Sequence, residues 1–203
     1  MTVLPSSIAL ALLSFLLQSY MCAKGKAAAR LEIPKSQHLD IVKVLNTSRR
    51  LWVYKRTQTN TFTINETYVQ LEIEETCIFN KKINISSTDY YFWQKMSVVG
   101  ETVELPLLGK FVENETEPPN AMDVWDLSEN DSSPFQRMTL NYTERGCSIF
   151  ILTPLQEDGE EECEMYIRNS NRSISPPHRC NEVFKRICKA SVYEPYKPSC
   201  KAE

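Results

Sequence analysis

Cysteines punctuate the last third of the chain, in the segments Cys147-Ser-Ile-Phe-Ile-Leu, Cys163-Glu-Met-Tyr-Ile-Arg, Pro176-Pro-His-Arg-Cys180, Phe184-Lys-Arg-Ile-Cys188 and Pro198-Ser-Cys200. The first two segments have the composition of short strands, the third is typical of a proline turn, and the fourth has the spacing of a short helix. Cysteines this close together indicate a disulfide framework. We therefore expect this region to fasten a helix to a sheet.

The beginning of the chain indicates a secretory leader. The apolar run from Ile8 to Leu17 has the length of a signal-peptide core and is too short to span a bilayer. Cleavage near Ala23 would make residues 1–23 the signal peptide and residues 24–203 the mature domain. Cys22 would leave with the leader, and the six remaining cysteines permit complete pairing. We expect a secreted, extracellular protein with no membrane anchor.

Asn-x-Ser/Thr sequons occur seven times. Their asparagines are Asn46, Asn65, Asn84, Asn114, Asn130, Asn141 and Asn171. One sequon is weak evidence of glycosylation, but seven together favour passage through a eukaryotic secretory pathway. A glycan must point into water, so each of these asparagines is expected at the surface.

The composition excludes several classes of function. The formal net charge is −3, and no cluster of Lys and Arg alternates with aromatic residues, so we expect neither nucleic acid nor membrane as a partner. The five glycines form no phosphate-binding pattern. The two histidines, His38 and His178, lie near opposite ends of the domain, and no cysteine is left unpaired as a nucleophile. We therefore predict no enzymatic activity, no metal site and no cofactor.

Alternation of apolar and polar residues predicts strands through most of the mature chain. The predicted strands are residues 51–57, 68–79, 90–99, 101–113, 121–127, 135–142, 147–153 and 162–168. Helices are predicted over residues 36–46 and 181–189. This order favours an all-β fold, an eight-stranded antiparallel up-and-down lipocalin barrel with a short N-terminal helix and a C-terminal helix packed outside. An immunoglobulin-like sandwich fits neither the strand count nor the late helix.

Several short motifs are similar to those of one known family. They are Asp40-Ile-Val-Lys43, Leu51-Trp-Val-Tyr-Lys55, Glu75-Thr-Cys77, Gly146-Cys147, Cys163-Glu-Met-Tyr166, Pro176-Pro-His-Arg-Cys180 with Phe184, and Pro198-Ser-Cys200. These segments resemble the salivary lipocalins of ticks, the histamine-binding protein family. Val42 stands where that family has tryptophan in its Asp-Ala-Trp-Lys motif, and between Lys81 and Pro134 the resemblance is one of pattern alone.

The resemblance implies two disulfides, Cys77–Cys200 and Cys147–Cys180, which leaves Cys163 to pair with Cys188. Period two places Cys163 on the same strand face as Met165 and Ile167. A helix packed outside the barrel would present Cys188 and Phe184 to that face.

The same alternation predicts which side chains line the barrel interior. Glu164 and Tyr166 would point inward. An outward glycan at Asn141 would send the side chains on the opposite face of that strand inward, and these belong to Met138, Leu140 and Tyr142. Further lining would come from Tyr90 with Phe92, or from Tyr91 with Trp93, and the sequence leaves both pairs open. Such residues either contact a ligand or fill a closed core.

Glu164 is the sharpest candidate for ligand contact. An ionised carboxylate inside an apolar barrel is costly unless a cation or several hydrogen-bond donors meet it. The resemblance implies that a glutamate here helps to hold the ammonium of an amine ligand. The alternative is an internal pair with Lys or Arg, or hydrogen bonds from Tyr142 and Tyr166.

Other positions at which amine-binding relatives carry acids or aromatics hold different residues here. They correspond to Gln58, Thr61, Met138 and Ser148. A cavity with one acid and many apolar side chains suits an amphipathic or lipid ligand better than a small polycationic amine. Ser148 and Met138 remain candidate ligand contacts.

Two hypotheses follow from these observations. In the first, a secreted lipocalin sequesters a small host mediator such as histamine, serotonin or a leukotriene in its cavity by mass action, and so suppresses inflammatory or haemostatic responses. In the second, the same fold inhibits a host protein, for example of complement, through loops at the barrel mouth. The fold itself does not decide between them.

Overall fold

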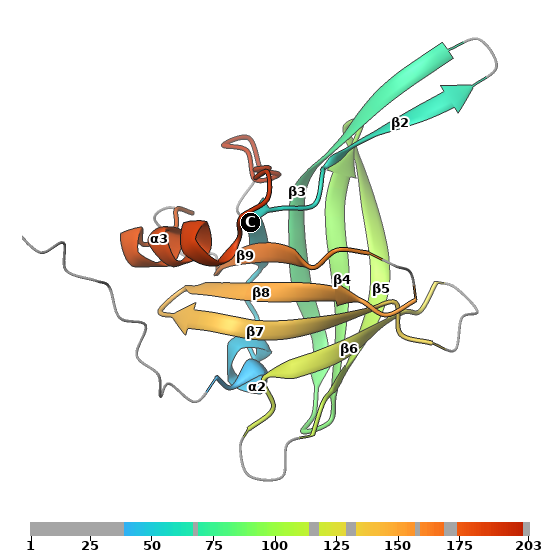
Figure 1. Ribbon diagram of the computed structural model, residues 1–203. Coiled ribbons are helices and arrows are strands. Elements are labelled where there is room, and N and C mark those ends of the chain that lie inside the picture. The colour runs from blue at the N-terminus through green and yellow to red at the C-terminus, as the bar shows by residue number, and fades with distance from the viewer. Residues whose placement is uncertain are drawn as a thin grey trace, which may run out of the picture. The chain divides into compact units, whose positions relative to one another are not determined.

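The computed structural model describes residues 39–66, 69–113, 118–128, 133–156, 159–168 and 174–200, which contain nine antiparallel strands and two helices (Figure 1). The helices are α2 (Ile41–Leu45) and α3 (His178–Ile187), and the strands are β1 (Leu51–Arg56), β2 (Thr61–Glu66), β3 (Val69–Ile85), β4 (Asp89–Val98), β5 (Glu101–Phe111), β6 (Ala121–Asp126), β7 (Gln136–Glu144), β8 (Cys147–Pro154) and β9 (Glu162–Arg168). Among these residues, neither helix is long and apolar enough to cross a membrane. The predicted leader lies outside the described residues.

Eight of the strands close into a barrel. Their order is β1-β9-β8-β7-β6-β5-β4-β3, and β1 pairs with β3 as well as with β9. The antiparallel eight-stranded barrel predicted from the sequence is therefore confirmed. The ninth strand, β2, pairs with β3 alone and was not among the predicted strands.

Strand β3 is longer than predicted, with 17 residues, because it belongs to two structures. Its first part pairs with β2 in a hairpin that projects from the barrel, and its second part pairs with β4 (Figure 1). The ladder shifts between Thr76 and Phe79, and Cys77 there has a positive φ of 53°. This bulge marks the change from hairpin to barrel wall, as bulges commonly do where a strand bends.

Helix α2 covers the end of the barrel at which β1 begins and β9 ends. Asp40 caps the helix, its Oδ1 accepting from the backbone N of Lys43 at 2.9 Å, as an N-cap aspartate should. The helix buries Ile41, Val44 and Leu45 among the interior side chains of the strands. Arg168, the last residue of β9, donates to the carbonyl oxygen of Val44 at 3.1 Å. We call the opposite end, where β1 ends and β9 begins, the mouth.

Helix α3 packs on the outside of the barrel, as expected. It begins at His178, after Pro177, and ends at Ile187, so it starts three residues before the predicted position. Val183 and Phe184 are buried against the outward face of β9. The three disulfides are Cys77–Cys200, Cys147–Cys180 and Cys163–Cys188, which confirms the predicted pairing.

The main core fills the barrel interior, and every barrel strand contributes to it. Its buried members are Ile41, Val44, Leu45, Leu51, Val53, Ile78, Tyr90, Phe92, Met96, Leu107, Phe111, Met122, Val124, Met138, Leu140, Phe150, Leu152 and Tyr166. A second cluster lies between the barrel wall and α3. The barrel wall therefore separates two apolar clusters.

Three sequon asparagines can be placed with their side chains. Asn46, Asn84 and Asn141 are all exposed, as glycan attachment requires. Asn65 lies in β2, with its side chain outside the described part of the structure, and Asn114, Asn130 and Asn171 lie outside the described residues. Glycosylation itself stays a prediction.

Candidate functional site

A connected polar network lies inside the otherwise apolar barrel. Glu164 in β9 is 5 % exposed, and its Oε2 accepts a hydrogen bond from the hydroxyl of Tyr166 at 2.5 Å. The Tyr166 oxygen in turn accepts from Nδ2 of Asn80 at 3.3 Å, and Oδ1 of Asn80 accepts from Nε2 of Gln94 at 3.4 Å. Strands β9, β3 and β4 thus join one buried acid to three polar side chains.

Period-two alternation in β9 produces this arrangement. Cys163, Met165 and Ile167 belong to the cluster under α3, whereas Tyr166 belongs to the interior core. Glu164 shares the inward face with Tyr166 and bonds to it. The predicted inward direction of both residues is therefore confirmed.

The protonation of this pair is governed by burial. Burial raises the pKa of the Glu164 carboxyl, and the hydrogen bond from Tyr166 and the charge of Arg56 lower it only in part. Burial, followed by the negative charge of Glu164, raises the pKa of the Tyr166 hydroxyl well above its usual value. Tyr166 therefore stays protonated as the donor. A cation placed beside Glu164 would favour the ionised carboxylate.

Arg56 is a buried cation that sequence reasoning did not identify. The β1–β9 register places it opposite Glu164, near the mouth. Its Nη2 donates to Oε2 of Glu75 at 2.8 Å and to the carbonyl oxygen of Thr59 at 2.9 Å, and its buried Nε has no hydrogen-bond partner among the described residues. Arg56 therefore pairs directly with Glu75 and acts on Glu164 through its charge alone.

The interior aromatics are the first of the two pairs that the sequence left open. Tyr90 and Phe92 are fully buried and stacked, with ring centroids 4.6 Å apart. Tyr91 is 39 % exposed, and Trp93, which is opposite Lys81 in the ladder, does not belong to the interior core. The candidate Trp93 therefore does not line the interior, because residues 89–96 alternate with the even-numbered side chains inward.

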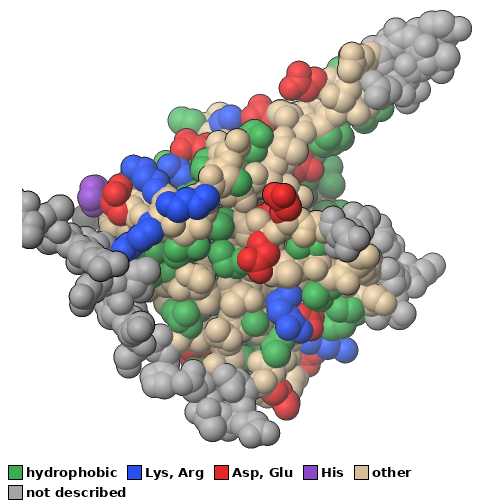
Figure 2. Space-filling view, viewed as in Figure 1, with side chains coloured by type: hydrophobic (Ala, Val, Ile, Leu, Met, Phe, Trp, Pro, Cys, Tyr) green, Lys and Arg blue, Asp and Glu red, His purple; other side chains and the backbone are tan. Residues whose placement is uncertain are grey.

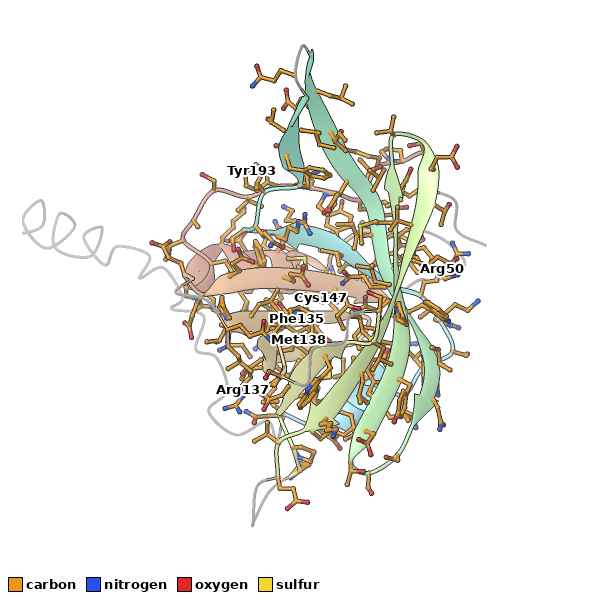
Figure 3. The ribbon with its side chains drawn as sticks, turned by 90° about the vertical axis from the view of Figure 1, so that its right-hand side faces the viewer. Arg50, Phe135, Arg137, Met138, Cys147 and Tyr193 are labelled. Atoms are coloured by element: carbon orange, nitrogen blue, oxygen red, sulfur yellow. A yellow bond between two sulfur atoms is a disulfide. The ribbon has the colours of Figure 1, made fainter. Side chains whose placement is uncertain are left out.

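Tyr142 does not point into the barrel, contrary to the prediction. Met138 lies within the barrel, while the neighbouring Arg137 lies outside and pairs with Asp123 (Figure 3). Beyond Leu140, however, the β7–β8 register shifts, so that Tyr142 is opposite Ile149 and packs in the cluster under α3. The sequence carries no sign of this bulge, and simple alternation therefore fails at this point.

Ser148 faces a second, much smaller polar site. It is buried, and its hydroxyl lies 2.9 Å from that of Thr143. With Glu144, Tyr166 and Arg168 it lines a pocket of about 10 Å³, which holds no more than one water molecule. This pocket, as the structure shows it, is too small for an organic ligand.

The positions that lack the acids of amine-binding relatives lie in different surroundings. Met138 is in the interior core, Gln58 is exposed, and Thr61 begins β2 and hydrogen-bonds to Thr59. Glu164 is the one buried acid in the described part of the chain. Within the same residues, no group of three or more His, Cys, Asp or Glu side chains is arranged to hold a metal ion.

Comparisons with known proteins agree with the barrel fold. A family model described as "Tick histamine binding protein" matches residues 31–202. Among solved structures, the crystal structure of an AM182 serotonin complex matches with a TM-score of 0.57 and 13 % identity, over 84 % of this chain and 98 % of that chain. At this identity the likeness shows a shared fold. None of the curated proteins matches the chain significantly in sequence. The extent of the family match shows that the chain belongs to the tick histamine-binding protein family.

Proposed function

We propose that this protein binds a small biogenic amine, such as histamine or serotonin, inside its barrel, and that Glu164 holds the ammonium group of the ligand. The observation that carries the proposal is that this buried acid forms no salt bridge with a cation in the described part of the structure. Glu164 is buried in an apolar interior, where its ionised form needs a cation, and Arg56 is already paired with Glu75. The family and the serotonin complex of the structural neighbour support the same ligand class.

The interior offers apolar and aromatic surfaces for the rest of the ligand. Phe150 meets Tyr166 edge to face at 5.2 Å, close to the proposed ammonium position. Three interior residues, Met96, Met122 and Met138, are methionines, whose unbranched side chains change conformation readily. We infer that these methionines yield space when the ligand enters. Leu140 completes the apolar wall.

The biological role that fits this binding is removal of a host mediator from solution. Three disulfides suit an extracellular protein, in agreement with the predicted leader and sequons. We propose secretion into tick saliva, where an abundant scavenger would lower the free concentration of the amine and suppress inflammatory or haemostatic responses. Such a scavenger acts by equilibrium binding and needs no catalytic residue.

Titration calorimetry with histamine and with serotonin tests the amine proposal. Replacing Glu164 by Gln keeps the shape of the side chain and removes its charge, so the affinity should fall about ten- to a hundredfold. Glu160→Gln, at an exposed acid of the β8–β9 connection, is the matched control and should bind like the wild type. Equal affinities of the Glu164→Gln variant and the wild type would reject the role of Glu164.

A second ligand class, amphipathic carboxylates such as fatty acids or leukotrienes, is favoured by Arg56. Its buried Nε lacks an acceptor among the described residues, and a ligand carboxylate could accept that hydrogen bond while the ligand's chain occupies the apolar interior. Titration with arachidonate separates the two classes. If a carboxylate is the ligand, Glu164→Gln should leave binding unchanged or improve it, and Arg56→Gln should weaken it.

The alternative of a protein-binding inhibitor is favoured by the β2–β3 hairpin. Phe62, Ile64 and Leu71 are exposed on this hairpin, where Ile64 is opposite Leu71. The hairpin projects from the rest of the molecule (Figure 2). A host protein, for example of complement, could contact that face. Native mass spectrometry of the secreted protein distinguishes the alternatives, because a scavenger should carry or accept a small molecule and a pure protein inhibitor should not.

A further inference from the structure

The hydroxyl of Tyr90 is set apart from the polar network of the barrel. Tyr90 lies at the beginning of β4, is 0 % exposed, and its Oη has no hydrogen-bond partner among the described residues. Hydrogen bonds join the interior side chains Glu164, Tyr166, Asn80 and Gln94 to one another. Buried tyrosine hydroxyls normally find a partner, and one without a partner destabilises the fold. This hydroxyl therefore needs an explanation.

The ring of Tyr90 is held firmly, while the wall beside it is adaptable. Stacking on Phe92, with an interplanar angle of 17°, fixes the ring. Gly109 is directly opposite Tyr90 on β5 and contributes no side chain, and Met122 fills this space, its sulfur lying 2.5 Å from where a Cβ of residue 109 would be. Because methionine is flexible, a ligand could displace Met122 and reach the hydroxyl without moving the tyrosine.

Tyr90 also stands in a defined relation to the proposed ammonium site. Tyr90 and Tyr166, whose hydroxyl bonds to Glu164, both belong to the interior core of the barrel. Around the barrel, β4 is separated from β9 by β3 and β1, so the two residues lie on different walls. Glu164 is near the mouth, and Tyr90 lies toward the end that α2 covers. A ligand held at Glu164 would therefore extend toward Tyr90.

We propose that Tyr90 determines specificity by hydrogen-bonding the polar far end of the amine whose ammonium lies at Glu164. The barrel would then prefer arylethylamines that carry a ring hydroxyl over the same amines without it. This inference rests on the proposed amine-binding function. It explains why the fold keeps a hydroxyl that packing alone would exclude, since functional sites are where such local costs persist.

Two pairs of probes isolate the ring hydroxyl: serotonin with tryptamine, and tyramine with phenethylamine. The wild type should bind the hydroxylated member of each pair about three- to tenfold more tightly, the range expected of one hydrogen bond. Tyr90→Phe should abolish this preference and leave the affinity for tryptamine and phenethylamine unchanged. Tyr91→Phe, on the exposed face of the same strand, is the control and should keep it.

Thermal unfolding of the same variants excludes a merely structural role. Tyr90→Phe loses no hydrogen bond, so its Tm in the absence of ligand should be equal to that of the wild type or higher by about 2–4 °C. A lower Tm, with all four amines weakened alike, would show that the hydroxyl supports the fold and would overturn the inference.

The outcomes also separate this inference from the proposed function. If the wild type binds the amines but Tyr90→Phe keeps the same preference between pair members, the inference alone is wrong. If the wild type binds none of the four amines, the amine-binding proposal fails and the inference falls with it.

Discussion

Strand β9 presents Cys163, Met165 and Ile167 to α3 on one face and Glu164 and Tyr166 to the barrel interior on the other. The outer face is secured by the Cys163–Cys188 disulfide and by apolar packing against α3. The inner face carries a buried acid whose pKa burial raises, next to a tyrosine that bonds to it. The same seven-residue strand thus packs against the helix on one side and, in the proposed function, contacts the ligand on the other.

This contrast makes the two faces separable by experiment. Changes on the outer face should lower the free energy of unfolding and leave amine affinity intact in conditions where the variant is folded. Changes on the inner face should alter affinity or its pH dependence, with smaller effects on unfolding.

The largest effect is expected from Phe184→Ala. Phe184 is fully buried between α3 and the barrel wall, and truncating a buried phenylalanine costs about 3–5 kcal/mol of unfolding free energy. Urea unfolding measures this loss, with Lys185→Ala, at an exposed neighbour in the helix, as the control. If Phe184→Ala lost amine affinity without losing stability, the separation of the two faces would be refuted.

Removal of the Cys163–Cys188 disulfide should come next. The cysteines are 25 residues apart, for which loop-closure entropy gives about 3.5 kcal/mol. The double variant Cys163→Ala with Cys188→Ala should show that loss in urea unfolding at pH 7. Its affinity for serotonin at low temperature should stay within about twofold of the wild type, and a tenfold loss would mean that the covalent link also shapes the interior.

A smaller effect, on serotonin affinity, should distinguish Tyr166 from Tyr142, two tyrosines that simple alternation would place together in the barrel interior. Tyr166→Phe removes the hydrogen bond to Glu164 and should change serotonin affinity about tenfold. Tyr142 lies beyond the β7 bulge, under α3, so Tyr142→Phe should leave the serotonin affinity unchanged. Calorimetry on the two variants measures both effects. The reverse order would show that Tyr142 faces the ligand after all.

The smallest effect is expected in how the free energy of unfolding depends on pH. The pKa of Glu164 is raised in the folded state, chiefly by burial, so the folded protein binds this proton more tightly than the unfolded chain does. The resulting stabilisation is fully present below the pKa of the unfolded chain and is lost as the pH rises through the folded pKa. Unfolding free energies measured from pH 4 to 8 should therefore show the wild type gaining stability on acidification relative to Glu164→Gln. A parallel pH dependence of the two proteins would contradict the raised pKa.

Much of this division could be predicted from the sequence. Alternation along Cys163 to Ile167 identified both faces of β9. The Cys163–Cys188 disulfide was the pair left after the family resemblance implied the other two, and the spacing of cysteines in α3 supported it. These signals are local, since one strand and one helix carry them. The count of barrel strands followed from the same kind of pattern.

The features that escaped prediction depend on pairing between strands. The β7 bulge reverses Tyr142, and the register of β1 against β9 brings Arg56 opposite Glu164. Neither can be seen in one strand alone. Strand β2 is different, because Phe62 and Ile64 alternate with polar residues and gave a usable signal.

The most direct test of the central claim is the proton balance of amine binding. At mildly acidic pH a fraction of the buried Glu164 carboxyl is protonated, and an ammonium placed beside it should expel that proton. Calorimetry of serotonin binding in two buffers of different ionisation enthalpy measures the number of protons released. We predict proton release by the wild type and none by Glu164→Gln. Equal proton release by the two proteins, or proton uptake by the wild type, would contradict the assignment of Glu164 as the ammonium site.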